Sequence, residues 1–366
     1  MSSIKRDLGQ IAERDACLQA AQEYFKTIGD LQRYQICLAR SFHNSAMRDP
    51  KITAQKIVQF FDVEQDYPAA VNAWLLSARA IVANKIGDMG ESCRLHILAH
   101  RAAFETGQIR QAILTATNAG DSFATLGDLD AALEWDEIAL ALARSNNWPS
   151  SLATALLQTG NALRLLHRYA DAREKLVESL AVQTKISSSR TYAHTLCYLG
   201  DLALDLGAPD DALGFFQSAA DKISEHNEPV FLSDCWRGQA IAYCRLGDVS
   251  AANEKIRNAL KIAQEHHNLD EQIKCYRVLA ELSKRCRNDT AEKIAAPTLS
   301  LHYLLKAHDL CKTIKDITVP ADLLDDIANS YADLDDYQNA FAYVKLAAKA
   351  KESRRLIDAQ NRAVAL

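Results

Sequence analysis

Helix-breaking residues are scarce in this sequence. Its 366 residues include seven prolines and thirteen glycines. Proline removes a backbone donor and clashes inside a helix, and glycine is entropically costly there. A strand-rich protein with many tight turns would need more of both. Because apolar residues make up 48% of the chain, enough for a continuous core, the composition predicts an all-α protein.

A strong charge of one sign and long apolar runs are also missing. The net charge of -5 gives no general attraction to nucleic acid or to anionic membranes. No segment approaches the ~20 consecutive apolar residues of a membrane-spanning helix. The N-terminal stretch MSSIKRDLGQIAERD has no apolar core behind its charges, so it is not a secretory signal. We therefore expect a cytoplasmic protein that binds neither nucleic acid nor membrane.

Sequence motifs of catalysis are absent. The chain has no Gly-Gly pair, no GxxxxGK[ST] phosphate loop, no GxSxG and no HExxH. Its nine cysteines form no CxxC pair and mostly occupy apolar helix positions, as expected of reduced, buried thiols. Cys93, His96 and His100 share one helical face and would need a fourth ligand to hold zinc. Two of the three lie at packing positions, so we predict no metal, no cofactor and no catalytic residue.

What is present is a repeat of 40 residues. Its turn positions carry Gly87-Asp88, Gly127-Asp128, His167-Arg168, Gly207 and Gly247-Asp248. Small residues recur at fixed offsets from each turn. Seven before it stand Ala80, Gly120, Gly160, Gly200 and Ala240; five after it, Ser92, Ala132, Ala172, Ala212 and Ala252; twelve after it, Ala99, Ala139, Ser179, Ala219 and Ala259. Five units in register indicate a repeat architecture.

The physical demands of paired helices explain these residue types. Two antiparallel helices approach closely only where small side chains let one backbone nest on the other. Glycine at the turn supplies a left-handed helix ending, and the aspartate after it can cap the next helix. One such unit cannot bury its apolar face alone, so neighbouring units must stack.

These positions resemble the tetratricopeptide repeat (TPR) family. The stretch from Ala119-Gly120 through Phe123, Leu126-Gly127-Asp128, Ala132-Leu133 and Ala139-Leu140 follows its pattern of small and large residues. The family period is ~34 residues, so a period of 40 implies helices lengthened by about a turn. The resemblance covers roughly 68–350 and implies an α-solenoid, a right-handed superhelix of antiparallel helix pairs.

Three regions follow from this pattern. Residues 1–67 form an irregular helical N-terminal cap, with helices expected near 4–28, 30–46 and 51–64. Residues 68–350 form a TPR array of about six repeats, with an insertion near 287–297. Residues 351–366 form a C-terminal capping or connecting helix.

The resemblance implies a binding groove, because in TPR arrays the first helix of each pair lines the concave face. The ligand-binding residues predicted on this basis are Asn118, Asp121, Gln158, Asn161, Arg164, Tyr198, Asp201, Arg237, Arg245, Lys274 and Arg277. The basic stretch among them suits a carboxylate or phosphate. The alternative is that the basic stretch and the adjacent acidic stretch of the last unit simply pair with each other as a solvated surface. The acidic stretch consists of Asp322, Asp325, Asp326, Asn329 and Asp333.

The C-terminal tail suggests a connection. Leu356, Ala359, Ala363 and Leu366 have the 3-4-3 spacing of an incipient heptad seam. In this the chain resembles the N-terminal TPR sensor region of bacterial signalling proteins such as diguanylate cyclases, although the GG[DE]EF cyclase signature is missing. The resemblance implies a non-catalytic sensor that binds a peptide, a protein or a small anionic ligand. Its C-terminal helix would relay the signal to an output domain and could pair in a homodimer.

Two alternatives stay open at this point. One is a stand-alone protein–protein interaction scaffold. The other is a regulator like the peptide-regulated TPR phosphatases, which need an N-terminal helical bundle with a catalytic glutamine. Gln10, Gln19 and Gln22 are available for that role, although nothing in the sequence singles one of them out.

Overall fold

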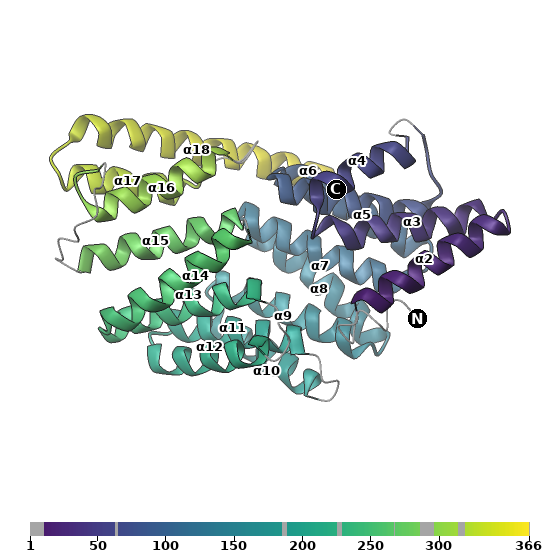
Figure 1. Ribbon diagram of the computed structural model, residues 1–366, viewed down its shortest axis with the longest axis horizontal. Coiled ribbons are helices and arrows are strands. Elements are labelled where there is room, and N and C mark those ends of the chain that lie inside the picture. Colours follow the sequence, from purple (N-terminus) through teal and green to yellow (C-terminus); the bar gives the residue numbers. More distant parts are fainter. Residues whose placement is uncertain are drawn as a thin grey trace. The chain divides into compact units, whose positions relative to one another are not determined.

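The computed structural model describes residues 11–62, 65–184, 189–224, 229–266, 268–285, 296–313 and 319–365. Within these ranges the chain folds into seventeen helices and contains no strand, which confirms the predicted all-α class. Three helices precede the array: α2 (Ile11–Thr27), α3 (Leu31–Ala46) and α4 (Pro50–Phe60). Figure 1 shows the helices following one another in antiparallel pairs.

Seven helix pairs follow residue 68, where the sequence predicts about six repeats. They are α5 (Ala69–Ile86) with α6 (Met89–Glu105), α7 (Ile109–Leu126) with α8 (Leu129–Ser145), α9 (Pro149–Leu165) with α10 (Tyr169–Gln183), α11 (Ser189–Asp205) with α12 (Pro209–Ser224), α13 (Pro229–Leu246) with α14 (Val249–Glu265), α15 (Leu269–Arg285) with α16 (Leu299–Thr313), and α17 (Ala321–Ala332) with α18 (Tyr337–Ala365). Most are longer than a helix of the 34-residue repeat, as the 40-residue period implies.

The chain divides into two compact units. Unit 1 comprises Met1–Ser188 with Asp358–Leu366, and unit 2 comprises Ser189–Ile357. The division falls between α10 and α11, inside the array that the sequence treats as one region. Each unit is therefore described by itself.

The turns within the helix pairs form as the repeat predicts. Gly87, Gly127, Gly207 and Gly247 have φ values of 91°, 81°, 75° and 86°, and His167 takes the same left-handed conformation at 59°. The aspartate after three of these turns caps the next helix through its side chain. Asp88 accepts from the Glu91 N–H at 3.0 Å, Asp128 from Ala131 at 3.3 Å, and Asp248 from Ala251 at 3.0 Å.

The small residues mark the points where two helices meet most closely. A Cβ added at Gly160 would lie 2.8 Å from Leu176 Cδ2, and one added at Gly200 would lie 2.8 Å from the Phe216 ring. At both glycines a large side chain of the second helix thus occupies the space next to the missing Cβ. Ala80 and Ala240 hold the same position in other repeats and are fully buried.

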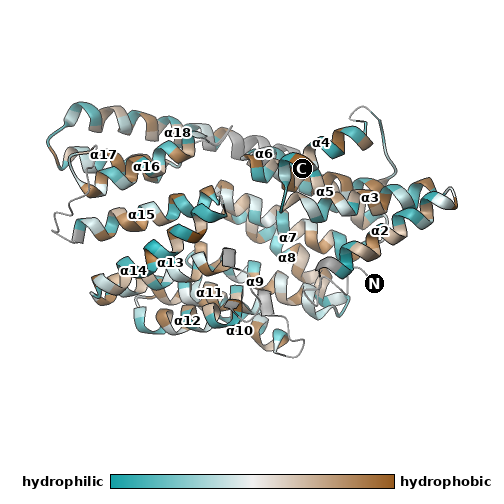
Figure 2. Ribbon diagram, in the orientation of Figure 1, coloured by the Kyte–Doolittle hydropathy of each residue, from teal (hydrophilic) through white to brown (hydrophobic). Residues whose placement is uncertain are grey.

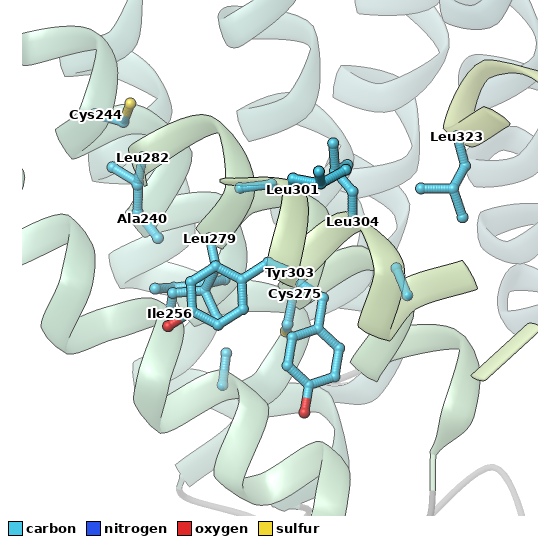
Figure 3. Packing of buried hydrophobic residues seen from close by; sticks show 14 of the residues in the cluster. Ala240, Cys244, Ile256, Cys275, Leu279, Leu282, Leu301, Tyr303, Leu304 and Leu323 are labelled. Carbon is cyan, nitrogen blue, oxygen red and sulfur yellow. The ribbon is translucent and has the colours of Figure 1, made fainter. Parts of the chain in front are cut away.

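Each unit has its own apolar core. In unit 2 the largest cluster joins α13 to α17, with Leu279, Leu301 and Tyr303 at its centre (Figure 3). In unit 1 a cluster under the N-terminal helices joins Phe42, Phe61 and Val71. Hydrophilic and hydrophobic stretches alternate along the helices (Figure 2), as expected when each helix buries one face.

One boundary of the N-terminal cap differs from the expectation. The helix predicted near 51–64 ends at Phe60, because Phe61 adopts an extended backbone (φ -129°, ψ 116°). The Phe61 side chain is 1% exposed and packs on Phe42 and Tyr67. Burial of this ring at the start of the connection therefore ends the helix earlier than its sequence pattern indicates.

The C-terminal part is a single helix in which α18 continues to Ala365, so the tail is helical as predicted. The side chains of the heptad positions 359, 363 and 366 lie outside the described residues, as does most of the predicted insertion, and the homodimer stays a prediction. None of the helices in the described ranges combines the length and apolarity needed to span a bilayer.

Candidate functional site

The first helices of successive pairs lie side by side within each unit. In unit 1, α5 contacts α7 and α7 contacts α9; in unit 2, α11 contacts α13 and α13 contacts α15. The contacts recur at fixed sequence separations. Trp74 Nε1 donates to Gln108 Oε1 at 2.6 Å, 34 residues on, and Gln111 donates to the Ala73 carbonyl across 38 residues. This register decides which side chains share one surface.

We call the solvent-facing stripe of these helices the first-helix face of each unit. In unit 1 it consists of Leu114, Asn118, Asp121, Thr125, Thr154, Gln158, Asn161 and Leu165. In unit 2 it consists of His194, Tyr198, Asp201, Asp205, Asp234, Ile241, Arg245, Lys274, Val278, Glu281, Asp322 and Asp326. Most of the predicted ligand-binding residues thus lie on one of the two faces, and Arg164, Arg237 and Arg277 lie beside them.

Neutral amides dominate the first-helix face of unit 1. Asn118 on α7 and Gln158 on α9 are half-buried, and within the described part of the chain no hydrogen bond engages either side-chain amide. Asn161 accepts from Arg164 Nη2 at 3.2 Å, and Asp121 is exposed. The three amides can both donate to and accept from a ligand, and the Asp121 carboxylate can accept.

A carboxyl group lies buried beneath this face. Asp136 on α8 is 2% exposed, and its Oδ1 has no hydrogen-bond partner. A Cβ on Gly120 would meet that oxygen, so the carboxyl group lies directly against the glycine. Burial raises the pKa of Asp136 well above its usual value, and the charge of Asp121 adds to the effect. The sequence signal, missed in our prediction, is a polar residue in a slot that holds Leu176, Phe216 and Ile256 in later repeats.

An ion-pair network crosses the first-helix face of unit 2. Arg237 Nε lies 2.8 Å from Glu271 Oε1, and Arg237 Nη2 lies 3.1 Å from Asp234 Oδ1. The Glu271 side chain is 3% exposed, and burial raises its pKa to about 8 against the opposing effect of Arg237. The guanidinium of Arg237 is thus held by carboxylates of its own chain.

The rest of the basic stretch is paired in the same way. Arg277 lies 2.8 Å from Asp322 and 2.9 Å from Asp326, while Lys274 lies 2.7 Å from Asp270. Arg245 donates to the Leu204 carbonyl. The sequence left two readings of these cations open, and at Arg237, Lys274 and Arg277 the structure has the pairing with neighbouring acids. An anionic ligand here would have to displace those acids.

Tyr198 and Asp201, the remaining predicted residues, are half-buried on α11. Both take part in further interactions within the chain. Next to Tyr198, Cys197 Sγ lies 3.3 Å from Cys235 Sγ on α13, a contact that the sequence analysis did not anticipate.

The trio Cys93, His96 and His100 does not have the character of a zinc site. Burial raises the pKa of Cys93 to about 12, which favours the neutral thiol over the thiolate that binds zinc, and it lowers the pKa of His96 to about 3. His100 Nδ1 lies 2.8 Å from the Ala112 carbonyl. In the portion of the chain that the structure describes, no group of three or more His, Cys, Asp or Glu side chains could hold a metal.

The candidate glutamines of the N-terminal helices have different surroundings. Gln22 donates to the Cys37 carbonyl at 3.2 Å, and Gln19 is exposed on α2. Gln10 lies outside the described residues.

Unit 1 also has a hollow of about 420 Å³ away from its first-helix face, between α8, α9 and α10. Cations and anions that line it pair with each other or with close neighbours. Arg168 lies 2.7 Å from Asp171, Lys175 lies 2.7 Å from Glu174, and Arg144 lies 2.8 Å from Glu178. We do not assign it a ligand.

The chain is similar to several known helical proteins. Residues 151–222 match the sequence model of the tetratricopeptide repeat. A Rap protein complexed with competence and sporulation factor has a TM-score of 0.70 at 15% identity, over 95% of this chain and 94% of that one. NprR in complex with its cognate peptide NprX has a TM-score of 0.66 at 14% identity, over 93% of each chain. Aspartyl phosphate phosphatase F from Bacillus subtilis has a TM-score of 0.55 at 11% identity, over 96% and 94%.

No curated protein sequence matches the chain. At such low identities the likeness to solved structures shows the fold alone, and none of these comparisons supports the resemblance to diguanylate cyclase sensors. The repeat match and the likeness in fold agree with the turns, caps and close helix contacts described above. The chain folds as a TPR-like α-solenoid, and its residues 151–222 match the tetratricopeptide repeat.

Proposed function

We propose that this protein is a non-catalytic, peptide-binding TPR regulator, and that an extended peptide binds across α7 and α9 on the first-helix face of unit 1. The observation that carries the proposal is the pair of half-buried amides, Asn118 and Gln158, which no group among the described residues engages. Each carboxamide offers two donors and an acceptor, which matches the N–H and C=O groups of a peptide backbone.

Burial makes these amides suited to binding. A half-buried polar group loses part of its hydration, and a partner that completes its hydrogen bonds recovers this free energy. Asn161 and Asp121 extend the polar stripe, and Leu114 and Leu165 supply apolar contacts at its ends. A peptide can thus be held by its backbone, with side-chain contacts adding specificity.

The first-helix face of unit 2 is less suited to this role. A ligand for Arg237 or Arg277 must compete with carboxylates already 2.8 Å away. Breaking such pairs without full replacement leaves buried charge uncompensated, which is costly. We therefore restrict the proposed peptide site to unit 1, although the sequence prediction included both.

The similar structures support a peptide as the ligand class. Two of them are complexes with competence and sporulation factor and with the cognate peptide NprX. Similarity to a phosphatase is a likeness of fold, and no placement of Gln19 or Gln22 favours that activity here, so a phosphatase function is not part of the proposal.

The test starts from a random linear peptide library selected against the full chain. The enriched peptide is synthesised and titrated by calorimetry against the wild type and N118A/Q158A. Each lost hydrogen bond costs about 1 kcal/mol, so the double variant should bind roughly 30-fold more weakly if each amide makes one bond. Its melting temperature should stay close to that of the wild type, because neither amide forms a hydrogen bond within the part of the chain that the structure describes.

The matched control is Gln59→Ala, which removes an exposed amide on α4, away from the first-helix face. This variant should bind like the wild type. If no peptide is enriched, or if N118A/Q158A binds as tightly as Q59A, the proposed function is wrong.

A further inference from the structure

Two thiols meet between the first helices of adjacent repeats in unit 2. Cys197 Sγ on α11 lies 3.3 Å from Cys235 Sγ on α13. Cys197 is partly exposed, whereas Cys235 is completely buried. A disulfide bond is about 2.05 Å long, so small rotations of the two side chains would bring the sulfurs to bonding distance.

The repeat register produces this contact. The two residues are 38 positions apart, the same separation at which Gln111 reaches Ala73 in unit 1. The equivalent pair one repeat later is Arg237 with Cys275, and the pair two repeats earlier is Thr117 with Ala155. Neither of these has two thiols, so the Cys197–Cys235 pair is particular to the α11–α13 junction.

We propose that Cys197 and Cys235 are an oxidation site, at which a small disulfide oxidant such as glutathione disulfide converts the two thiols into an intramolecular disulfide. The thiolate of Cys197, the accessible partner, attacks the oxidant and releases one thiol. The thiolate of Cys235 then attacks Sγ of Cys197 in the mixed disulfide and releases the second thiol. One S–S bond of the oxidant is lost, one forms in the protein, and the two cysteine protons end on the released thiols.

The surroundings set the speed of this exchange. The hydrogen bond with Cys235 raises the pKa of Cys197 well above its ordinary value, followed by burial and the charges of Cys235, Asp201 and Asp234. Arg237, the cation of the network, is held by Asp234 and Glu271. Since the thiolate is the attacking species, exchange should be slow near neutral pH and faster in alkaline solution.

The disulfide would fix α11 to α13 beside Tyr198 and Asp234 on the first-helix face of unit 2. Closing a loop of this length restricts the unfolded chain and should raise the melting temperature by several degrees. The inference concerns unit 2 and does not rest on the proposed peptide site, so either can fail without the other.

The sequence makes the test unambiguous. Tryptic cleavage after Arg190, Lys222 and Arg237 gives two peptides, 191–222 and 223–237, that each contain one of the two cysteines and no other. The full chain is incubated with glutathione disulfide at about pH 8.5, near the ordinary cysteine pKa, then acid-quenched, alkylated and mapped by mass spectrometry. We expect the two peptides to appear as one disulfide-linked species, together with a higher melting temperature that dithiothreitol reverses.

Variants separate this outcome from general oxidation. Cys235→Ser should trap the mixed disulfide on Cys197, and Cys197→Ser should abolish both the linked species and the rise in melting temperature. Cys275→Ser, at the position equivalent to Cys235 in the next repeat, should leave both intact. If a serine variant fails to fold by circular dichroism, the alanine variant replaces it. Two separately alkylated peptides after prolonged oxidation, or a persistent mixed disulfide in the wild type, would overturn the proposal.

Discussion

The first helices of unit 1 and unit 2 are built on the same register, yet their exposed stripes differ in how polar groups are satisfied. On unit 1, Asn118 and Gln158 remain without partners among the described residues. On unit 2, Arg237 and Arg277 are each held by two carboxylates. The repeat determines where a side chain lies, whereas its neighbours one repeat away determine whether it is available to a ligand.

The two units also differ at one core position of the second helix, which lies behind the first-helix face. In unit 1 that slot holds Asp136 and Leu176, and in unit 2 it holds Phe216 and Ile256. At this position unit 1 thus has a buried carboxyl oxygen without a hydrogen-bond partner, whereas unit 2 has apolar side chains. The three variants below test how much each difference contributes to stability.

Arg237→Ala should have the largest effect. It leaves the Glu271 carboxyl, which is 3% exposed, without its cation, and breaking a buried pair costs about 3–5 kcal/mol. The loss of unfolding free energy, measured by urea denaturation, should be smaller at pH 7 than at pH 9, because the pKa of Glu271 is about 8. The pKa of Glu271 is raised in the folded state, so protonation removes the buried charge at low pH and the penalty grows as pH rises.

The control for this variant is Arg164→Ala in unit 1, which removes a guanidinium bonded to the neutral Asn161. It should cost less than ~1.5 kcal/mol, as for an ordinary hydrogen bond. If both variants lost the same unfolding free energy, the ion-pair network of unit 2 would contribute no more to stability than an ordinary hydrogen bond.

Gly238→Ala should have an intermediate effect. Its Cβ would lie 2.4 Å from the Phe216 ring, which is also wedged against Gly200 and cannot move away. Overpacking at contacts this short costs about 3 kcal/mol, the upper end of the usual range, which exceeds the ~1 kcal/mol that alanine gains in helix propensity. Thermal melting followed by circular dichroism should therefore show a lower melting temperature.

The matched change in unit 1 is Gly160→Ala, where the Cβ would meet the branched end of Leu176 at 2.8 Å. Leucine can change rotamer where a wedged ring cannot, so this variant should be close to neutral. A G160A protein destabilised as strongly as G238A would contradict the distinction between the two units.

Asp136→Leu should have the smallest effect and the opposite sign. The change gives unit 1 the side chain that Leu176 places in the same slot, over a glycine in both cases. Removing an unsatisfied buried group should stabilise the protein by about 1–2 kcal/mol at neutral pH. Because the folded-state pKa of Asp136 is raised, its ionisation costs stability as pH rises, so the gain should be larger at pH 7 than at pH 4.

Asp136→Asn serves as the control, since it keeps the shape and removes the ionisation. It should lose the pH dependence without gaining the full stability. If D136L were less stable than the wild type at neutral pH, the Asp136 carboxyl group would have to form a stabilising interaction, and the prediction would be wrong.

Much of the fold was predictable because its determinants are local. The left-handed turn at Gly127, the cap by Asp128 and the close approach at Gly160 each depend on residues within one helix pair. Their chemistry repeats every 40 residues, so the period and its small positions could be read directly. The end of α4 was misplaced because burial of Phe61 in a tertiary cluster, and no local signal, ends that helix.

The candidate sites were predicted less completely. Helical spacing placed Asn118 and Gln158 on one face, but the pairing of Arg277 with Asp322 joins helices 45 residues apart across the insertion. The contact of Cys197 with Cys235 likewise depends on how one first helix sits against the next. The spacing of residues within one helix cannot predict either contact, because the partner lies on another helix.

By itself, therefore, the sequence determined that this protein is a TPR solenoid, because periodic small residues, turns and caps act within each repeat. Only the tertiary structure decided which polar side chains of the first helices are paired and which remain available. Glu271, which holds Arg237, and Asp322, which holds Arg277, lie 34 and 45 residues away from those arginines, and only the stacking of repeats brings them within hydrogen-bonding distance.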